Sequence, residues 1–115
     1  MKKNILFIGG STGIGKETIK QICENHNIYI ACRSDENLGG LNVTFIKFDA
    51  INDEFPIEKI PETLDGFVYF PGTINLRPFR SLKVETFIED LNINFLSMVK
   101  CLKSVIGNLK KSENS

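Results

Sequence analysis

A glycine-rich turn between a short apolar run and an amphipathic segment constrains this chain more than any other feature. Residues 5–8 read Ile-Leu-Phe-Ile, a run typical of a strand buried on both faces of a parallel sheet. Four glycines follow and let the backbone turn tightly and approach a ligand closely: Gly9, Gly10, Gly13 and Gly15. A helix expected from about Ile14 would aim its free N–H groups at this turn, which is the geometry of a phosphate site. The alternative, a flexible loop that binds nothing, is disfavoured by the flanking strand and helix.

The composition limits the number of domains and the kinds of partner and site that the chain can have. A chain of 115 residues, 42% hydrophobic, forms one domain at most. Its 14 basic and 14 acidic side chains cancel, so charge favours neither a nucleic acid nor a membrane surface as partner. No apolar run approaches the roughly 20 residues that span a bilayer, and the N-terminus shows no signal peptide. The three cysteines (23, 32 and 101) lack zinc-type spacing, so we expect no metal site and free thiols in a reducing cytoplasm.

The order of elements predicts the fold class. Strands are expected at 28–32, 43–48 and 67–70, with weak helical material at 57–60. Apolar residues at steps of three and four then predict a long amphipathic helix over 84–109. Strands that alternate with crossovers indicate an α/β fold, a Rossmann-type doubly wound parallel sheet with strand order 3-2-1-4.

The glycine spacing carries a family resemblance. Gly9-x-x-x-Gly13-x-Gly15, with Ser11 and Thr12 inside it, closely resembles the cofactor loop of the short-chain dehydrogenase/reductases. The resemblance covers essentially the whole chain and implies that this loop, with Ile14, binds the cofactor. Ile8 stands where the family usually has a threonine, a departure that spares the glycines.

Three further positions match the family. Asp49, followed by Ala50, matches the acidic residue that reaches the adenine amino group, although it could instead be a simple turn residue. Pro71 and Gly72 end a stretch that replaces the family's Asn-Asn-Ala-Gly, so only the glycine is kept. Asn94 matches the helix asparagine that supports the family's proton relay. The alternative for Asn94 is a partly exposed side chain with a local hydrogen bond.

The residues after the second strand bear on the choice of dinucleotide. By counting alone, Asp35 could be the carboxylate that selects NAD. The strand register instead puts Cys32 at the acidic position and Arg33 next, where the family selects NADP. A guanidinium pairs well with a 2′-phosphate, and Ser34 could add a hydroxyl donor. We therefore favour NADP over NAD.

The family's remaining chemistry is not found in these residues. Its catalytic serine and Tyr-x-x-x-Lys exchange a proton with the substrate while hydride moves to or from nicotinamide. Here Tyr29 and Tyr69 are followed four residues later by Arg33 and Thr73. The sequence is therefore interpreted as a truncated form, the cofactor-binding N-terminal half-domain over 1–115. We expect it to be inactive alone.

Two functions stay open. The first is an NADP(H)-dependent oxidoreductase that acts, at full length, on a small-molecule alcohol or ketone. The second is a non-catalytic dinucleotide-binding module that works as a sensor or partner-binding domain. The resemblance also implies a homo-oligomer that pairs through the helix over 84–109. The strand over 67–70 is expected at an open sheet edge that favours self-association.

Overall fold

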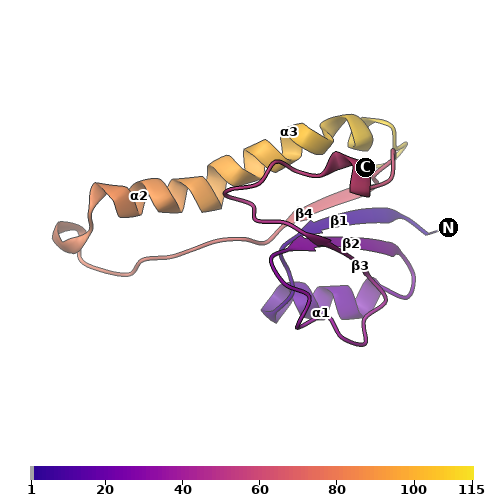
Figure 1. The fold of residues 1–115 in the computed structure, drawn as a ribbon, viewed down its shortest axis with the longest axis horizontal. Helices are drawn as coiled ribbons and strands as arrows, with labels where there is room; N and C mark the ends of the chain where they lie inside the picture. Colours follow the sequence, from indigo (N-terminus) through magenta and orange to yellow (C-terminus); the bar gives the residue numbers. More distant parts are fainter. Residues whose placement is uncertain (1) are drawn as a thin grey trace.

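The computed structural model describes residues 2–115 and contains one four-stranded sheet. Its strands are β1 (Asn4–Ile8), β2 (Asn27–Cys32), β3 (Thr44–Lys47) and β4 (Gly66–Tyr69). All three pairings are parallel, and the spatial order is β3-β2-β1-β4 (Figure 1). The predicted sheet and strand order are confirmed, and every strand end lies within one residue of the expected position.

Helices cover both faces of the sheet, as a doubly wound fold requires. Helix α1 (Gly13–Ile22) covers one face, and helix α3 (Ser97–Lys110) covers the other (Figure 1). The α1 side buries Phe7, Ile19, Cys23, Ile28, Ile30, Cys32 and Leu38. The α3 side buries Leu6, Ile8, Ala31, Ile46, Phe48, Ala50, Phe55, Ile60, Leu64, Cys101 and Val105. Alternate residues of β1 thus enter opposite clusters, which explains why the whole strand is apolar.

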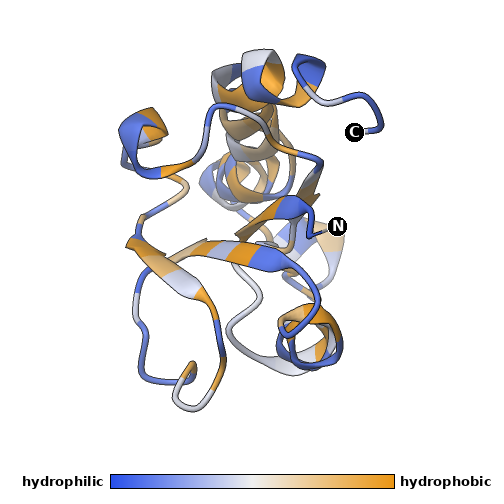
Figure 2. Cartoon of the chain, turned by 90° about the vertical axis from the view of Figure 1, so that its right-hand side faces the viewer, coloured by the Kyte–Doolittle hydropathy of each residue, from blue (hydrophilic) through white to orange (hydrophobic). Residues whose placement is uncertain are grey.

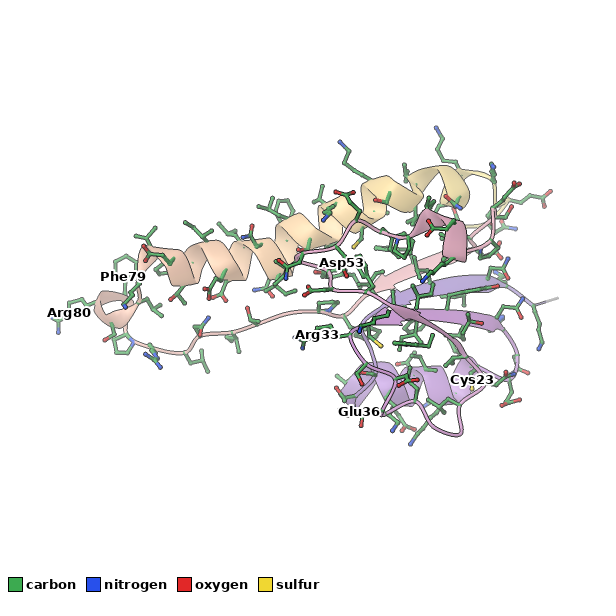
Figure 3. All side chains as sticks on the ribbon, viewed as in Figure 1. Cys23, Arg33, Glu36, Asp53, Phe79 and Arg80 are labelled. Carbon is green, nitrogen blue, oxygen red and sulfur yellow. The ribbon has the colours of Figure 1, made fainter. Side chains whose placement is uncertain are left out.

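The connections are mostly irregular. The weak helix predicted at 57–60 is one 3₁₀ turn, η1 (Ile57–Lys59). A second 3₁₀ turn, η2 (Phe79–Ser81), was not predicted. Between β4 and η2 the chain runs in extended form to the tip of the molecule, where Phe79 and Arg80 lie far from the sheet (Figure 3).

The predicted long helix is continuous but not uniform. It consists of α2 (Val84–Leu91), a π-helical segment η3 (Asn92–Leu96), and α3. At the end of η3 the Ser97 N–H donates to the Asn92 carbonyl, five residues back, and not to that of Ile93. The Ile93 carbonyl instead accepts a 2.6 Å hydrogen bond from the Tyr69 hydroxyl. The π segment therefore has a tertiary partner in β4 that periodicity could not reveal.

The two halves of this helix differ in burial. In α3 the inward residues Ser97, Cys101 and Val105 are buried at steps of four. Helix α2 has no buried residue and projects beyond the sheet, giving the molecule dimensions of 53 × 30 × 22 Å (Figure 1). Figure 2 shows hydrophobic residues on the helices as well as in the strands. The exposed ones on α2 and η3 are Val84, Phe87, Ile88, Leu91, Phe95 and Leu96.

Strand β4 lies at one edge of the sheet, as predicted. Its residues are only partly buried, and no strand in the described part of the chain pairs with its outer side. The edge sequence Phe67-Val68-Tyr69 carries no charge and no proline, so it lacks the usual features that block pairing with another chain.

Candidate functional site

The glycine turn joins β1 to α1 at the carboxyl ends of the strands. Gly9, Gly10 and Gly13 have φ values of +73°, +94° and +59°, a region that other residues adopt rarely. A Cβ on Gly15 would lie 2.4 Å from the Cα of Gly10, too close for any real contact. The turn therefore packs backbone against backbone at Gly10 and Gly15, and only glycine fits there.

The N-terminus of α1 points its unpaired donors at this turn. Thr12 occupies the N-cap position but makes no side-chain capping bond. The first intrahelical bond is the one from the Lys16 N–H to the Thr12 carbonyl, at 3.3 Å. The N–H groups of residues 13–15 precede it and have no intrahelical partner, and the first turn carries no acidic side chain. This end of the helix is suited to an anion.

An open groove of about 900 Å³ runs along the carboxyl edge of the sheet. Eleven of the predicted cofactor residues line it: Gly9, Ser11, Thr12, Ile14, Gly15, Arg33, Ser34, Asp49, Ala50, Pro71 and Gly72. Two predicted site residues do not. Gly13 lies at the first position of α1 outside the lining, and Asn94 lies one layer behind it.

The end of β2 supplies the groove's only lining arginine among residues 2–115. Arg33 and Ser34 are exposed there, and Figure 3 shows Arg33 at the carboxyl ends of the strands. Cys32, at the position where an acid would select NAD, donates its thiol to the Ser34 carbonyl at 3.2 Å. Burial raises the pKa of this thiol, which keeps it protonated and neutral. Asp35, the alternative NAD-type carboxylate, does not line the groove.

Asp49 organises the turn after β3. Its Oδ1 accepts from the Ile51 and Asn52 N–H groups at 3.0 and 3.4 Å, and its Oδ2 accepts from Asn52 Nδ2 at 2.9 Å. These bonds, the side-chain bond from Asn52 first, hold the pKa of Asp49 below its usual range. The carboxylate thus has the structural role of a turn residue and, still lining the groove, stays ionised and able to accept a further bond.

The end of β4 forms the opposite wall. Pro71 packs on the glycine turn, where a Cβ on Gly9 would lie 3.1 Å from Pro71 Cδ. A Cβ on Gly72 would lie 3.0 Å from Asn94 Oδ1. Asn94 accepts from the Thr73 N–H at 2.8 Å and donates to the Thr73 carbonyl at 2.9 Å. Asn94 is exposed, as the alternative for it expected, but the local hydrogen bond of that alternative is wrong, because the partner lies 21 residues away.

A neighbouring carboxylate was missed by the sequence reasoning. Asp90 Oδ1, one turn before Asn94, accepts from Thr73 Oγ1 at 2.7 Å and from Asn75 Nδ2 at 2.8 Å. These residues border a second hollow of about 610 Å³ that shares Ile51, Thr73 and Ile93 with the groove. Nothing in the spacing of Thr73, Asn75 and Asp90 indicated that they would meet.

The groove also has lining residues that were not predicted to bind a cofactor. They are Glu36, Asn37, Phe48, Ile51, Phe70, Thr73 and Ile93, together with Ile8, Gly10, Ala31 and Cys32 from the strands and turn. Phe48 and Phe70 follow directly after β3 and β4, and Ile8, Ala31 and Cys32 lie at the carboxyl ends of β1 and β2. The rule that ligands bind at the carboxyl ends of parallel strands could have found these five.

Two other kinds of feature are absent from residues 2–115: a cluster of metal ligands and a membrane-spanning helix. This part of the chain brings no three His, Cys, Asp or Glu side chains together in a way that could hold a metal ion. Its helices include none with the length and hydropathy to cross a membrane.

Comparison with known proteins gives similarity in structure. No protein-family model and no curated protein sequence matches the chain. A short-chain dehydrogenase/reductase from Serratia marcescens matches with a TM-score of 0.75 at 19% identity, covering 93% of this chain. YwfH, an NADPH dependent reductase involved in bacilysin biosynthesis, matches with a TM-score of 0.82 at 18% identity over all of this chain. ElxO with NADP bound matches with a TM-score of 0.73 at 26% identity, covering 92%.

The chain has the fold of the short-chain dehydrogenase/reductases. It spans about half the length of these solved structures, 51%, 56% and 50% of the three chains in the order given. The predicted resemblance is confirmed at the level of the fold, with the glycine turn in the place that the motif indicated.

Proposed function

We propose that this chain is the cofactor-binding part of an NADP(H)-dependent oxidoreductase of the short-chain dehydrogenase/reductase type. Residues 1–115 would form a single dinucleotide-binding unit. The observation that supports this most strongly is the groove itself. It runs at the carboxyl edge of a parallel sheet, across the point where the strand order reverses between β1 and β4.

The pyrophosphate would lie on the glycine turn. The turn is free of Cβ atoms at Gly9, Gly10 and Gly15, and the unpaired N–H groups of the first turn of α1 face the same place. The hydroxyls of Ser11 and Thr12 add donors, and the Thr12 hydroxyl makes no capping hydrogen bond to the helix. Backbone donors without opposing carboxylates are what a diphosphate requires.

The adenosine half would extend toward β2 and β3. Arg33 and Ser34, which line the groove, would bind the 2′-phosphate, and the ionised Asp49, beside Ala50, would accept from the adenine amino group. The neutral Cys32 thiol leaves the usual NAD-selecting position without a carboxylate. This favours NADP over NAD, in keeping with the NADP bound to ElxO and the NADPH dependence of YwfH.

The nicotinamide half would then extend over the end of β4. Pro71 and Gly72 form that wall, and Asn94 supports it from behind through Thr73. Nicotinamide exchanges hydride with a carbonyl or alcohol carbon, so an alcohol or ketone is the proposed substrate class. The family's serine and Tyr-x-x-x-Lys are not among these 115 residues, so we expect no turnover from this chain by itself.

The same proposal covers location and assembly. The three cysteines are free and buried, which is in keeping with a reducing cytoplasm. The exposed apolar face of α2 and η3 is proposed to pair with a second copy of the chain. Contiguous apolar surface of this kind is typical of association sites.

The test of the proposed function is a fluorescence titration with NADPH and NADH. Arg33→Asp is expected to weaken NADPH binding by about 10–100-fold, because a hydrogen bond to a charged group contributes about 1.5–3 kcal/mol. NADH binding should change by far less, because NADH carries no 2′-phosphate.

Arg80→Asp is the matched control. It makes the same change of charge at the exposed tip of the molecule (Figure 3) and should leave both affinities unchanged. An unaltered ratio of NADPH to NADH affinity in Arg33→Asp would remove Arg33 from the site. Failure of the unaltered chain to bind either dinucleotide would refute the proposed function.

A further inference from the structure

The wall of the groove beyond β4 is an extended segment without regular secondary structure. We call residues 71–75 the strap. All but Pro71 are exposed, and the chain continues from the strap alongside α2 toward the tip (Figure 1). A free segment of this kind would be mobile, because its backbone groups make no sheet or helix bonds. The strap nevertheless carries Pro71, Gly72 and Thr73 into the groove lining.

Two side chains of the long helix hold the strap in place. Asn94 binds both backbone groups of Thr73, at 2.8 and 2.9 Å. Asp90, four residues earlier and so on the same side of the helix, accepts from Thr73 Oγ1 at 2.7 Å and Asn75 Nδ2 at 2.8 Å. The two Asn94 bonds restrain the backbone of Thr73 only. Asp90 adds two bonds to side chains two residues apart, those of Thr73 and Asn75. These bonds restrain the direction in which the strap continues beyond Thr73.

We propose that Asp90 is a positioning residue that holds the strap against the long helix and thereby sets the affinity for the nicotinamide half of the dinucleotide. The inference rests on the proposed function for its ligand, and on the Thr73 and Asn75 bonds for its mechanism. Asp90 does not line the groove itself and acts through Thr73, which does.

The chemistry of the contact favours a carboxylate but does not demand one. One oxygen, Oδ1, accepts both bonds, and bonds to an ionised acceptor are roughly twice as strong as neutral ones. The amide oxygen of an asparagine could accept the same two bonds more weakly, whereas alanine could accept neither. Glu89 borders the same second hollow, but its carboxylate accepts no hydrogen bond from the side chains or backbone of residues 2–115. It therefore provides a neighbouring carboxylate that does not bind the strap.

The first measurement compares two ligands on the full 115-residue chain. NADPH reaches both halves of the groove, and 2′-phospho-ADP reaches only the adenosine half. Asp90→Ala should lower the affinity for NADPH about tenfold, as expected for losing two charge-assisted bonds that order the strap. The affinity for 2′-phospho-ADP should not change. Asp90→Asn should restore most of the NADPH affinity, and Glu89→Ala should match the unaltered chain.

The second measurement is amide hydrogen exchange without any ligand. The Thr73 N–H should exchange about tenfold faster in Asp90→Ala than in Glu89→Ala, because the strap opens more often. Thr73→Val keeps the side-chain shape but removes the hydroxyl bond to Asp90, so it should also lower the affinity for NADPH. This variant tests the same contact if Asp90→Ala fails to fold.

The outcomes separate the two proposals. Equal NADPH affinities in Asp90→Ala and Glu89→Ala would overturn the positioning role. Equal loss of both ligands in Asp90→Ala would also overturn it, since the effect would then be on the whole fold. If the unaltered chain bound neither ligand, the proposed function would fail with the nicotinamide part of this inference, while the exchange rates would decide separately whether Asp90 holds the strap.

Discussion

Gly15→Ala is the sharpest test of how the glycine turn is built. The added methyl carbon would lie 2.4 Å from the Cα of Gly10, 3.2 Å from the Gly10 carbonyl carbon and 3.2 Å from its oxygen. The obstacle is backbone, which cannot rotate away as a long side chain can, so the helix and the turn must separate. Inserting one methyl group into a packed site costs about 1–3 kcal/mol, and this contact belongs at the upper end of that range.

Helix propensity acts in the opposite direction and sets the net effect. Replacing glycine by alanine inside a helix stabilises it by about 1 kcal/mol. The net loss in the free energy of unfolding should therefore be about 1–2 kcal/mol. With an m value of about 2 kcal/mol/M, the urea midpoint should fall by about 0.5–1 M.

Gly107→Ala is the matched control for this prediction. Gly107 lies inside α3, is exposed, and has no atom within 4 Å of the Cβ position. There the propensity gain stands alone, so the urea midpoint should rise. If both variants were stabilised, Gly15 would not pack on the Gly10 backbone, and the turn would have room for a side chain.

Two other changes test the junction of the long helix and its exposed face. Tyr69→Phe removes the hydroxyl bond to the Ile93 carbonyl and should cost about 0.5–1.5 kcal/mol in urea unfolding at neutral pH. Burial raises the pKa of Tyr69 to about 12, from 10.0, so its proton stabilises the fold fully below about pH 10. That contribution to the free energy of unfolding is lost as the pH rises toward 12, and Tyr69→Phe should not show this part of the loss. Identical dependence of stability on pH above 10 in the two proteins would contradict this prediction. Leu91, 57% exposed on α2, should mediate self-association, so Leu91→Glu should shift sedimentation toward monomer. Leu76→Glu, 83% exposed on the connection before η2, should not, and an unaltered chain that sediments as a monomer would contradict the interface.

Much of the fold could be predicted because its causes are local. Residues 5–8 are apolar on both faces of the strand, and the glycines that follow allow only a tight turn. Short strands separated by crossovers then leave few arrangements of a parallel sheet. Beyond the glycine turn, the predicted lining residues came from the family resemblance, and they lie where ligands bind in such sheets, at the carboxyl ends of the strands.

The features that were missed have tertiary causes. The π segment depends on Tyr69, which takes up the Ile93 carbonyl from a different element. The anchor of the strap depends on Asp90, which meets Thr73 and Asn75 only after the helix folds back along the chain. None of these pairs leaves a periodic trace in the sequence.

Periodicity also could not say which half of the long helix is buried. Apolar residues recur at the same steps before and after residue 94. Yet Leu91 is exposed, while the more polar Ser97 is buried because α3 alone lies over the sheet. The helix is buried only where it lies over the sheet, so the length of the strands, and not the helix pattern, decides where its burial ends.

An amide NMR titration of the unaltered chain with NADPH would locate the dinucleotide on the molecule. We expect chemical-shift changes to concentrate at residues 9–15, 33–34, 49–50 and 72–73, the four segments that meet at the carboxyl edge of the sheet. Saturating NADPH without shifts there, or shifts confined to the exposed face of α2, would contradict a dinucleotide site in this groove.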